Sequence, residues 1–441
     1  EVTGSRYLVE SEGVKLLVDC GLFQGQGLAK HNWDPFPVDP KTIDAIVITH
    51  AHIDHTGYIP LLVKNGFKGS IYCSPATYAL CRLLLIDSGS VQESNARNRE
   101  EHGNSDLPPD PLYTIEDAQN ALTFFQAADY GTPIKISASV EVTLIRSFHI
   151  LGSSFVVVSD GKQKLSFSGD LGRPQQLIMK DPPAIGTTDY LVLESTYGDR
   201  EHGKGDPIEA LGQAIVDGIK KGGMVIIPAF AVERTQLILY CLYQLKKQKT
   251  IPQNIPIFLD SPLAIGVTDL FCKFPDEHTL SVSECKEIFG QFIPTRTVDE
   301  SKRLNSLSGQ AIIIAGSGMA DGGRVVHHLR HTLSDAKNTI IFVGYQAHGT
   351  TGDILVGGAK KIKIQDFWYE VHATVTNVNI FSAHADYNEV LLWLGHFQKP
   401  PKKVFLTHGD VESAASLKKK IEERFGWTVV IPKYLDSFPL D

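Results

Sequence analysis

The sequence predicts an α/β protein in which one α/β module is inserted into another α/β or αββα domain. Three observations lead to this prediction. Up to about residue 198, apolar strand segments such as "VKLLVDCG" alternate with helical segments. From about Asp206, short and continuously apolar strands lie between helical patterns, which is typical of a parallel sheet covered on both faces. From about residue 371, "VTNVNIFSAHAD" and "KKVFLTHGD" resume the pattern of the first part.

The first part is expected to alternate strands and helices. We expect a helix from Thr77 to Leu85, and an irregular or loosely helical polar stretch from Asp87 to Asp110. Strands are expected at residues 14–21, 43–49, 69–75, 140–150, 154–160, 164–172 and 188–198.

The middle part contains clear helix signals between its strands. Asp206 followed by Pro207 predicts a helix start, and Gly222-Gly223 predicts the end of that helix. Short apolar strands are expected within residues 224–230, 255–262, 311–318 and 339–346.

Composition indicates a soluble globular protein without a membrane segment. The chain has 441 residues, of which 42% are hydrophobic and 21% charged, and no apolar run has the length needed to span a bilayer. Its six cysteines show no CxxC spacing, so we expect reduced thiols and a cytoplasmic location. The net charge of −8 argues against broad attraction to nucleic acid but is compatible with a local basic groove. The chain does not begin with Met, and we expect a short N-terminal piece to precede it.

Residues 49 to 56, "THAHIDHT", follow the apolar strand "IDAIVIT" and contain four metal-capable side chains. On a continuing strand, His50, His52 and Asp54 would share one face, and His55 would face away, which suggests two neighbouring binding positions. So many polar groups at one strand end would repel or desolvate each other without a cation. The cluster therefore predicts a metal site.

Similar side chains recur at other predicted strand ends. His149 lies in "RSFHILGSS", Asp170 in "SFSGDLG" and His408 in "VFLTHGD". A lone histidine at such a position is more often a core or surface residue. Together with the cluster, these residues are expected to project from one sheet edge toward a shared catalytic metal site, where zinc takes imidazole and carboxylate ligands.

These motifs resemble those of a known superfamily. "HAHIDH" matches the HxHxDH motif of the metallo-β-lactamase fold, and "LLVDCG", "SFHILGSS" and "FSGDLG" are similar to its other motifs. The long insertion and the segments "LESTYG", "FSAHAD" and "LTHGD" resemble the β-CASP branch, the nucleases of RNA processing and DNA repair. The resemblance implies an αββα metallo-β-lactamase sandwich (residues 1–198 and 371–441) with an inserted parallel α/β β-CASP domain (residues 199–370).

The resemblance also implies a ligand set for two zinc ions per chain. Asp170 would bridge the two ions, and Asp19 would orient ligands without binding metal itself. The remaining ligands would be His50, His52 and His149 for the first ion and Asp54, His55 and His408 for the second.

A proton donor is needed for the leaving 3′ oxygen, and the resemblance implies His384 paired with Glu194. With Asp54, these two form the predicted catalytic residues. The alternative for Glu194 is a cap or turn acceptor in "ESTYG".

Contacts to substrate are expected from the middle part. The segment "AGSGMADGGRVVHHLRH" combines a Gly-rich turn with a helix start, so Ser317 and Arg324 are candidate phosphate ligands. Arg234 in "PAFAVERTQ" is a further candidate, although a surface cation explains it equally well. The three histidines of this helix are expected on its surface or against substrate.

The resemblance implies a zinc-dependent ribonuclease that cleaves single-stranded RNA endonucleolytically. His408 favours RNA processing, because the DNA-repair branch typically has Val at that motif. Three alternatives stay open: a 5′ exoribonuclease of the ribonuclease J kind, a non-catalytic RNA-binding scaffold, and a small-ester hydrolase. Association of identical chains is also left open.

Overall fold

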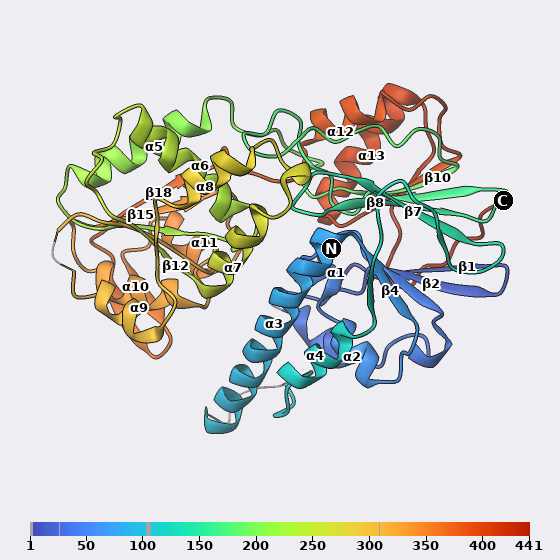
Figure 1. The fold of residues 1–441 in the computed structure, drawn as a ribbon, viewed down its shortest axis with the longest axis horizontal. Coiled ribbons are helices and arrows are strands. Elements are labelled where there is room, and N and C mark those ends of the chain that lie inside the picture. Colours follow the sequence, from blue (N-terminus) through green and yellow to red (C-terminus); the bar gives the residue numbers. More distant parts are fainter. Residues whose placement is uncertain (1–2, 26, 103–106, 308) are drawn as a thin grey trace. The chain divides into compact units, whose positions relative to one another are not determined.

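The computed structural model describes residues 3–25, 27–102, 107–307 and 309–441 of the chain, which forms two compact units (Figure 1). Unit 1 comprises Glu1–Glu201 and His384–Asp441, and unit 2 comprises His202–Ala383.

Unit 1 contains two sheets that pack face to face. Valine, leucine and alanine side chains of one sheet meet those of the other in a shared core, which includes Leu16 and Val47 from the first sheet and Leu144 and Val156 from the second. The first sheet has the order β1 (Tyr7–Ser11), β2 (Val14–Val18), β3 (Ala45–Val47), β4 (Ser70–Cys73), β5 (Phe125–Ala127). The second has the order β20 (Val429–Val430), β19 (Lys403–Thr407), β10 (Tyr190–Glu194), β9 (Lys164–Phe167), β8 (Ser154–Ser159), β7 (Glu141–Arg146), β6 (Ile134–Lys135).

Helices cover the outer faces of this sandwich. Against the second sheet, Trp393 and Leu394 of one helix and Leu417 of the next pack on Leu193 and Leu406. The helices on this side are α12 (Tyr387–Leu394) and α13 (Val411–Phe425). Those of the other half are α1 (Ile53–Thr56), α2 (Ile59–Lys64), α3 (Pro75–His102) and α4 (Ile115–Leu122). The predicted αββα arrangement is therefore confirmed.

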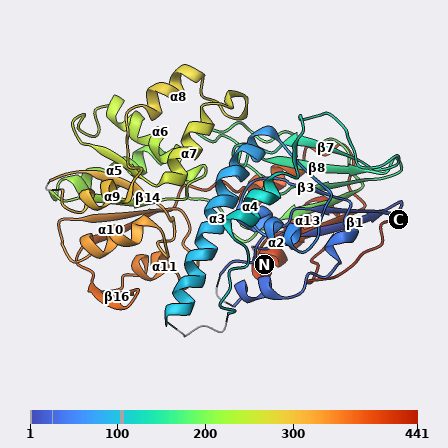
Figure 2. The same cartoon turned by 60° about the horizontal axis from the view of Figure 1, so that its bottom comes forward.

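Helix α3 continues without a break from Pro75 to His102 (Figure 2). For the polar stretch from Asp87, where the apolar pattern ends, the sequence left irregular and loosely helical structure open, and the helical alternative is confirmed as far as His102. The later turns consist of good helix formers, and helical backbone hydrogen bonds do not require an apolar face. Glu93 also accepts a hydrogen bond from the backbone N–H of Ile115, at the start of α4, over 2.9 Å.

Unit 2 is built on a parallel sheet, as its apolar strands predicted, and Figure 1 shows helices on both sides of it. Ile226, Ile313 and Phe342 of the sheet share a core with Val325 and Leu329 of a covering helix. The strand order is β13 (Ile293–Pro294), β12 (Ile257–Asp260), β14 (Ile312–Ala315), β11 (Val225–Pro228), β15 (Thr339–Val343), β18 (Thr374–Val378), and a separate hairpin pairs β16 (Lys361–Ile364) with β17 (Phe367–Glu370). The helices are α5 (Pro207–Ile219), α6 (Arg234–Lys247), α7 (Pro262–Phe271), α8 (Val282–Phe289), α9 (Val298–Leu304), α10 (Arg324–Thr332) and α11 (Thr351–Val356).

The chain leaves unit 2 later than the sequence suggested. Residues from 371 onward were expected to belong to the closing part of the first domain, but β18 pairs in parallel with β15. An alternating strand pattern does not reveal which sheet a strand joins, since pairing partners are distant in sequence. Among the described residues, no helix has both the length and the apolarity needed to cross a membrane.

Candidate metal centre

The predicted ligands all lie in unit 1, at the ends of its strands. His50 and His52 follow β3, and the next turn forms α1, which carries Asp54 and His55. Asp170 follows β9, Glu194 ends β10, and His408 follows β19. Because these three strands are parallel neighbours, their carboxyl ends meet at one sheet edge.

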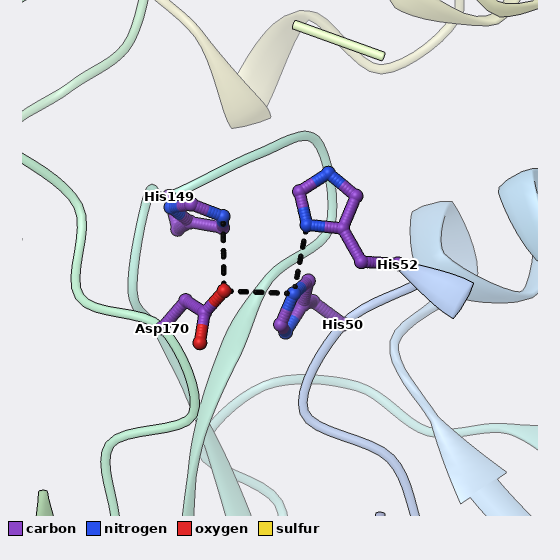
Figure 3. A group of neighbouring side chains, drawn as sticks. All are labelled: His50, His52, His149 and Asp170. Carbon is purple, nitrogen blue, oxygen red and sulfur yellow. Dashed lines mark hydrogen bonds and ion pairs between the residues drawn. The ribbon is translucent and has the colours of Figure 1, made fainter. Parts of the chain in front are cut away.

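His50, His52, His149 and Asp170 form the first group of side chains (Figure 3). Oδ2 of Asp170 lies 3.4 Å from Nε2 of His50 and 3.4 Å from Nε2 of His149. Nδ1 of His52 approaches Nε2 of His50 to 3.1 Å. Ligand atoms of all four residues lie within 4.8 Å of one another, which is the spacing that a single cation requires of its ligands.

Asp54, His55 and His408 form the second group, on the other side of the same carboxylate. Oδ1 of Asp170 lies 3.3 Å from Nε2 of His55 and 3.5 Å from Nδ1 of His408. Nε2 of His408 also lies 3.2 Å from Oδ2 of Asp54. Asp170 thus directs one oxygen toward each group, as a bridging ligand would.

The chemistry of these groups fits bound cations. Burial lowers the pKa of His50 to about 3 and that of His52 to about 4, so both imidazoles are neutral and have a lone pair for a metal. Nε2 of His55 and Oδ1 of Asp170 are buried without a hydrogen-bond partner among the described residues. Buried polar atoms of this kind are rare unless they face an ion or water, and here they face one another.

Asp19 orients side chains of the cluster through hydrogen bonds. Its carboxylate accepts hydrogen bonds from the backbone N–H and the hydroxyl of Thr49, both 2.7 Å long, and lies 2.7 Å from Nδ1 of His55. Held through Nδ1, the ring of His55 presents Nε2 to Asp170. Oγ1 of Thr49 lies 3.0 Å from Nδ1 of His50 as well. Sequence analysis missed Thr49, although its position directly before the histidine cluster was a usable signal.

Three residues at the site have a strained backbone conformation. Asp19, Phe148 and His408 have positive φ values of 56°, 53° and 48°. Residues other than glycine rarely adopt this left-handed backbone conformation. Those that do are typical of functional sites, where surrounding contacts hold them. Two of the three are predicted site residues, and the third precedes His149.

Glu194 and His384 are paired in the structure. Nδ1 of His384 lies 3.0 Å from Oε2 of Glu194, and 3.8 Å from Oδ2 of Asp170. Glu194 also accepts from the N–H of Leu171, on a distant segment, over 2.5 Å. Thr196, which sequence analysis missed, donates its hydroxyl to Glu194 over 2.5 Å and lies 3.1 Å from Nδ1 of His408.

The environment of His384 favours its protonated form. Burial alone would lower the pKa of this imidazole, but the negative charges of Glu194 and Asp170 outweigh it and raise the pKa to about 9. With Nδ1 turned to Glu194, the other ring nitrogen, Nε2, is the atom from which a proton can leave.

The predicted substrate contacts lie in unit 2, and the side chains of two of them, Arg324 and Arg234, have partners within it. Nη1 of Arg324 donates to Asp260 over 2.6 Å, and Nη2 donates to the carbonyl of Arg296 over 2.8 Å. Nη1 of Arg234 donates to the carbonyl of Val343 over 2.6 Å. Ser317 lies in the turn before α10, where its N–H bonds to the carbonyl of Gly322. The role of these three residues toward substrate stays a prediction.

One of the helix histidines differs from expectation. His328 was expected on the surface of α10 or against substrate, but it is fully buried. Its Nε2 lies 2.6 Å from Oδ2 of Asp260, and its Nδ1 lies 2.9 Å from the side-chain oxygen of Asn305. Sequence analysis did not single out Asp260, which binds both His328 and Arg324.

Comparison with known proteins supports the family that the motifs suggested. The chain matches the metallo-beta-lactamase superfamily over residues 2–125, the Beta-Casp domain over 235–355 and the Zn-dependent metallo-hydrolase RNA specificity domain over 368–432. A Thermus thermophilus protein named ribonuclease TTHA0252 is 35% identical over 448 residues, covering 100% of this chain and 98% of its own length. The transcription termination factor FttA of Pyrococcus horikoshii is 31% identical over 472 residues, covering 100% of this chain and 69% of FttA.

A solved structure shares the fold. The crystal structure of a protein of unknown function from Enterococcus faecalis V583 superposes with a TM-score of 0.53 at 12% identity, over 98% of this chain and 95% of that one. The family matches and the similarity to the Thermus protein extend over both units of the chain. They agree with the architecture described above and with the histidine–aspartate cluster. The chain belongs to the β-CASP family of metal-dependent hydrolases with the metallo-β-lactamase fold.

Proposed function

We propose that this protein hydrolyses phosphodiester bonds within single-stranded RNA, using two zinc ions held by the groups on either side of Asp170. The observation that supports this most directly is the position of that carboxylate, which directs one oxygen to each ligand group. RNA is proposed because one relative is named a ribonuclease and because residues 368–432 match an RNA specificity domain.

The proposed ligands are those that the structure brings together. His50, His52 and His149 would hold the first ion, and Asp54, His55 and His408 the second. When bound, zinc polarises phosphoryl oxygens and lowers the pKa of water, which supplies a nucleophile at neutral pH. Asp19 and Thr49 keep Nε2 of His55 aimed at the centre, so that the geometry exists before substrate arrives.

His384 is proposed to act on the leaving group. In-line attack on phosphorus expels the 3′ oxygen, which leaves as an alkoxide unless it receives a proton. Nε2 of His384 would supply that proton, while Glu194 keeps the ring oriented through Nδ1 and stabilises its positive charge. Thr196 in turn holds Glu194 through a hydrogen bond of 2.5 Å.

Incubation of zinc-loaded protein with end-labelled single-stranded RNA and DNA tests the proposal. Internal fragments from RNA alone are expected, and Asp170→Ala serves as the inactive control. Stepwise shortening from the 5′ end would show an exoribonuclease instead. Absence of cleavage by protein with a full complement of metal would leave only a scaffold role.

A further inference from the structure

The hairpin of β16 and β17 in unit 2 exposes two large aromatic side chains next to each other in sequence. Phe367 and Trp368 are 61% and 62% exposed. In the antiparallel register, Trp368 lies directly opposite Lys363, and Lys361 lies opposite Glu370. Figure 2 shows the hairpin, labelled at β16, beside α11.

Strand alternation gives this hairpin two chemically different faces. Ile362 and Ile364 point inward, are almost fully buried and belong to the core of unit 2. The outward face carries Lys361, Lys363, Trp368 and Glu370. Core packing therefore explains the isoleucines but not the tryptophan, which leaves a large apolar ring in solvent.

Cations border both exposed rings. The ammonium of Lys361 lies 5.7 Å from the centroid of the Trp368 ring, and the guanidinium of Arg330, on α10, lies 5.9 Å from that of Phe367. Only Lys361 of these has a carboxylate partner among the described residues, Glu370 at 3.4 Å. The four outward residues hold two lysines and one carboxylate, that of Glu370, so this face has a small positive charge on a chain whose net charge is −8, and Lys363 is the cation that suits an anionic ligand best.

We propose that Lys361, Lys363 and Trp368 of this outward face, called here the Trp368 surface, bind single-stranded RNA by stacking one base on the indole. The lysines contact the neighbouring phosphates. An exposed aromatic ring flanked by cations is the arrangement with which proteins bind single strands regardless of sequence, because every base has a face that stacks. This inference rests on the proposed ribonuclease function and adds an RNA contact made by residues that are not metal ligands.

The binding test uses tryptophan fluorescence of the zinc-loaded protein titrated with a phosphorothioate oligouridylate, which resists cleavage. Wild-type fluorescence is expected to be quenched on binding. Trp368→Ala should abolish most of that quench and raise Kd by roughly 5-fold to 150-fold, the range known for loss of one base–aromatic stack. Trp368→Phe should restore most of the affinity without the quench, because a phenyl ring still stacks.

The charge test compares two exposed lysines. Lys363→Ala should weaken binding and reduce the slope of log K against log salt by about 0.7, the value for one phosphate contact on a single strand. Lys419→Ala, on α13, is the matched control, since its side chain is 76% exposed and it lies in unit 1. Its Kd and salt slope should equal those of the wild type.

Cleavage kinetics separate failure of the Trp368 surface from failure of the proposed function. In Trp368→Ala, KM for a long RNA should rise relative to KM for a nitrophenyl phosphodiester, which has no second nucleotide to stack. If the wild type cleaves RNA and this ratio does not change, the surface is not an RNA site. If the same variant instead turns a dimer into a monomer in sedimentation, the aromatic pair is a protein interface and the proposal is wrong. If the wild type cleaves no RNA, the proposed function itself fails.

Discussion

Asp170 is the residue on which the two ligand groups converge. It is almost completely buried, and its two oxygens face different histidines at 3.3 to 3.5 Å. Burial alone would raise the pKa of this carboxyl, but the neighbouring imidazoles, His408 and His55 foremost, outweigh it and hold the pKa well below its usual range. An ionised carboxylate in this position is available to two cations at once.

Substitution of Asp170 is therefore expected to affect both ions. Asp170→Ala should reduce the bound zinc from two ions per chain toward none, whereas His149→Ala should mainly empty the first position, because His149 contacts only one oxygen of the carboxylate. Elemental analysis of dialysed protein measures this directly. A single zinc ion in fully loaded wild-type protein would contradict the two-ion centre.

His384 allows proton transfer to be separated from metal binding. His384→Ala should keep zinc content and RNA binding near those of the wild type while the cleavage rate falls by roughly 10²–10⁴-fold, the usual contribution of general acid catalysis. The rate of cleavage of a nitrophenyl phosphodiester should fall less, because its leaving group is stable as an anion. Glu194→Gln should show a milder loss of the same kind. Loss of zinc from His384→Ala, or equal losses on both substrates, would make His384 a ligand or a structural residue.

At the scale of elements, Asp260 connects three segments of unit 2. It ends β12 and binds Ser301 of α9 as well as Arg324 and His328 of α10, with distances of 2.6 Å in each case. Arg324 also donates to the carbonyl of Thr295, in the segment before α9, over 2.9 Å. The start of α10, and with it the turn that contains Ser317, is thus anchored to the sheet.

Loss of this carboxylate should destabilise unit 2. Asp260→Ala removes the carboxylate that accepts from the buried His328 and Ser301 and that pairs with Arg324, and breaking a buried ionic network in this way typically costs about 3–5 kcal/mol. Thermal or urea unfolding measures the change. Thr250→Ala, in an exposed turn of the same unit, should shift the midpoint little. A change below about 1 kcal/mol in Asp260→Ala would contradict the anchoring role.

The same network predicts a pH dependence with a definite sign. Burial alone would raise the pKa of Asp260, but hydrogen bonds from His328, Ser301 and Arg324 outweigh it and hold the pKa below the ordinary value of 3.8. A carboxyl with a lowered folded pKa stabilises the fold above its unfolded pKa and loses that contribution as the pH falls toward the folded value. Wild-type stability should therefore drop below about pH 3.8 more steeply than that of Asp260→Asn, as followed by urea unfolding at several pH values.

At the scale of the whole molecule, metal binding should be linked to stability. All proposed ligands belong to unit 1, so a chelator should lower the melting temperature of that unit and leave the melting of unit 2 unchanged. The stabilisation is about 4 kcal/mol when free zinc is 1,000 times its Kd. Differential scanning calorimetry with chelator, and with zinc restored, measures it. Asp170→Ala should not respond, and an equal response from this variant would assign the effect to zinc bound elsewhere.

The sequence by itself determined the two-module α/β architecture and the candidate ligands. Strands can be predicted from apolar periodicity within a short stretch of sequence. The cluster of His50, His52, Asp54 and His55 is also contained in one short stretch, and such a cluster at a strand end would be unstable without a cation. The positions of His149, Asp170 and His408 at other strand ends pointed to the more distant members, and the family motifs implied how they divide between two ions. The pairing of His384 with Glu194 followed from those motifs and not from spacing, because 190 residues separate the two.

Only the tertiary structure decided features that depend on contacts between distant segments. The assignment of β18 to the sheet of unit 2, the burial of His328 against Asp260, and the support that Thr49 and Thr196 give to the centre are all of this kind. The continuation of α3 to His102 belongs with them, since its polar turns lack the apolar pattern that marks a helix. Hydrophobic periodicity records which side of an element is buried, but hydrogen bonds between elements depend on where the folded backbone places each side chain, and that placement is set by the whole chain.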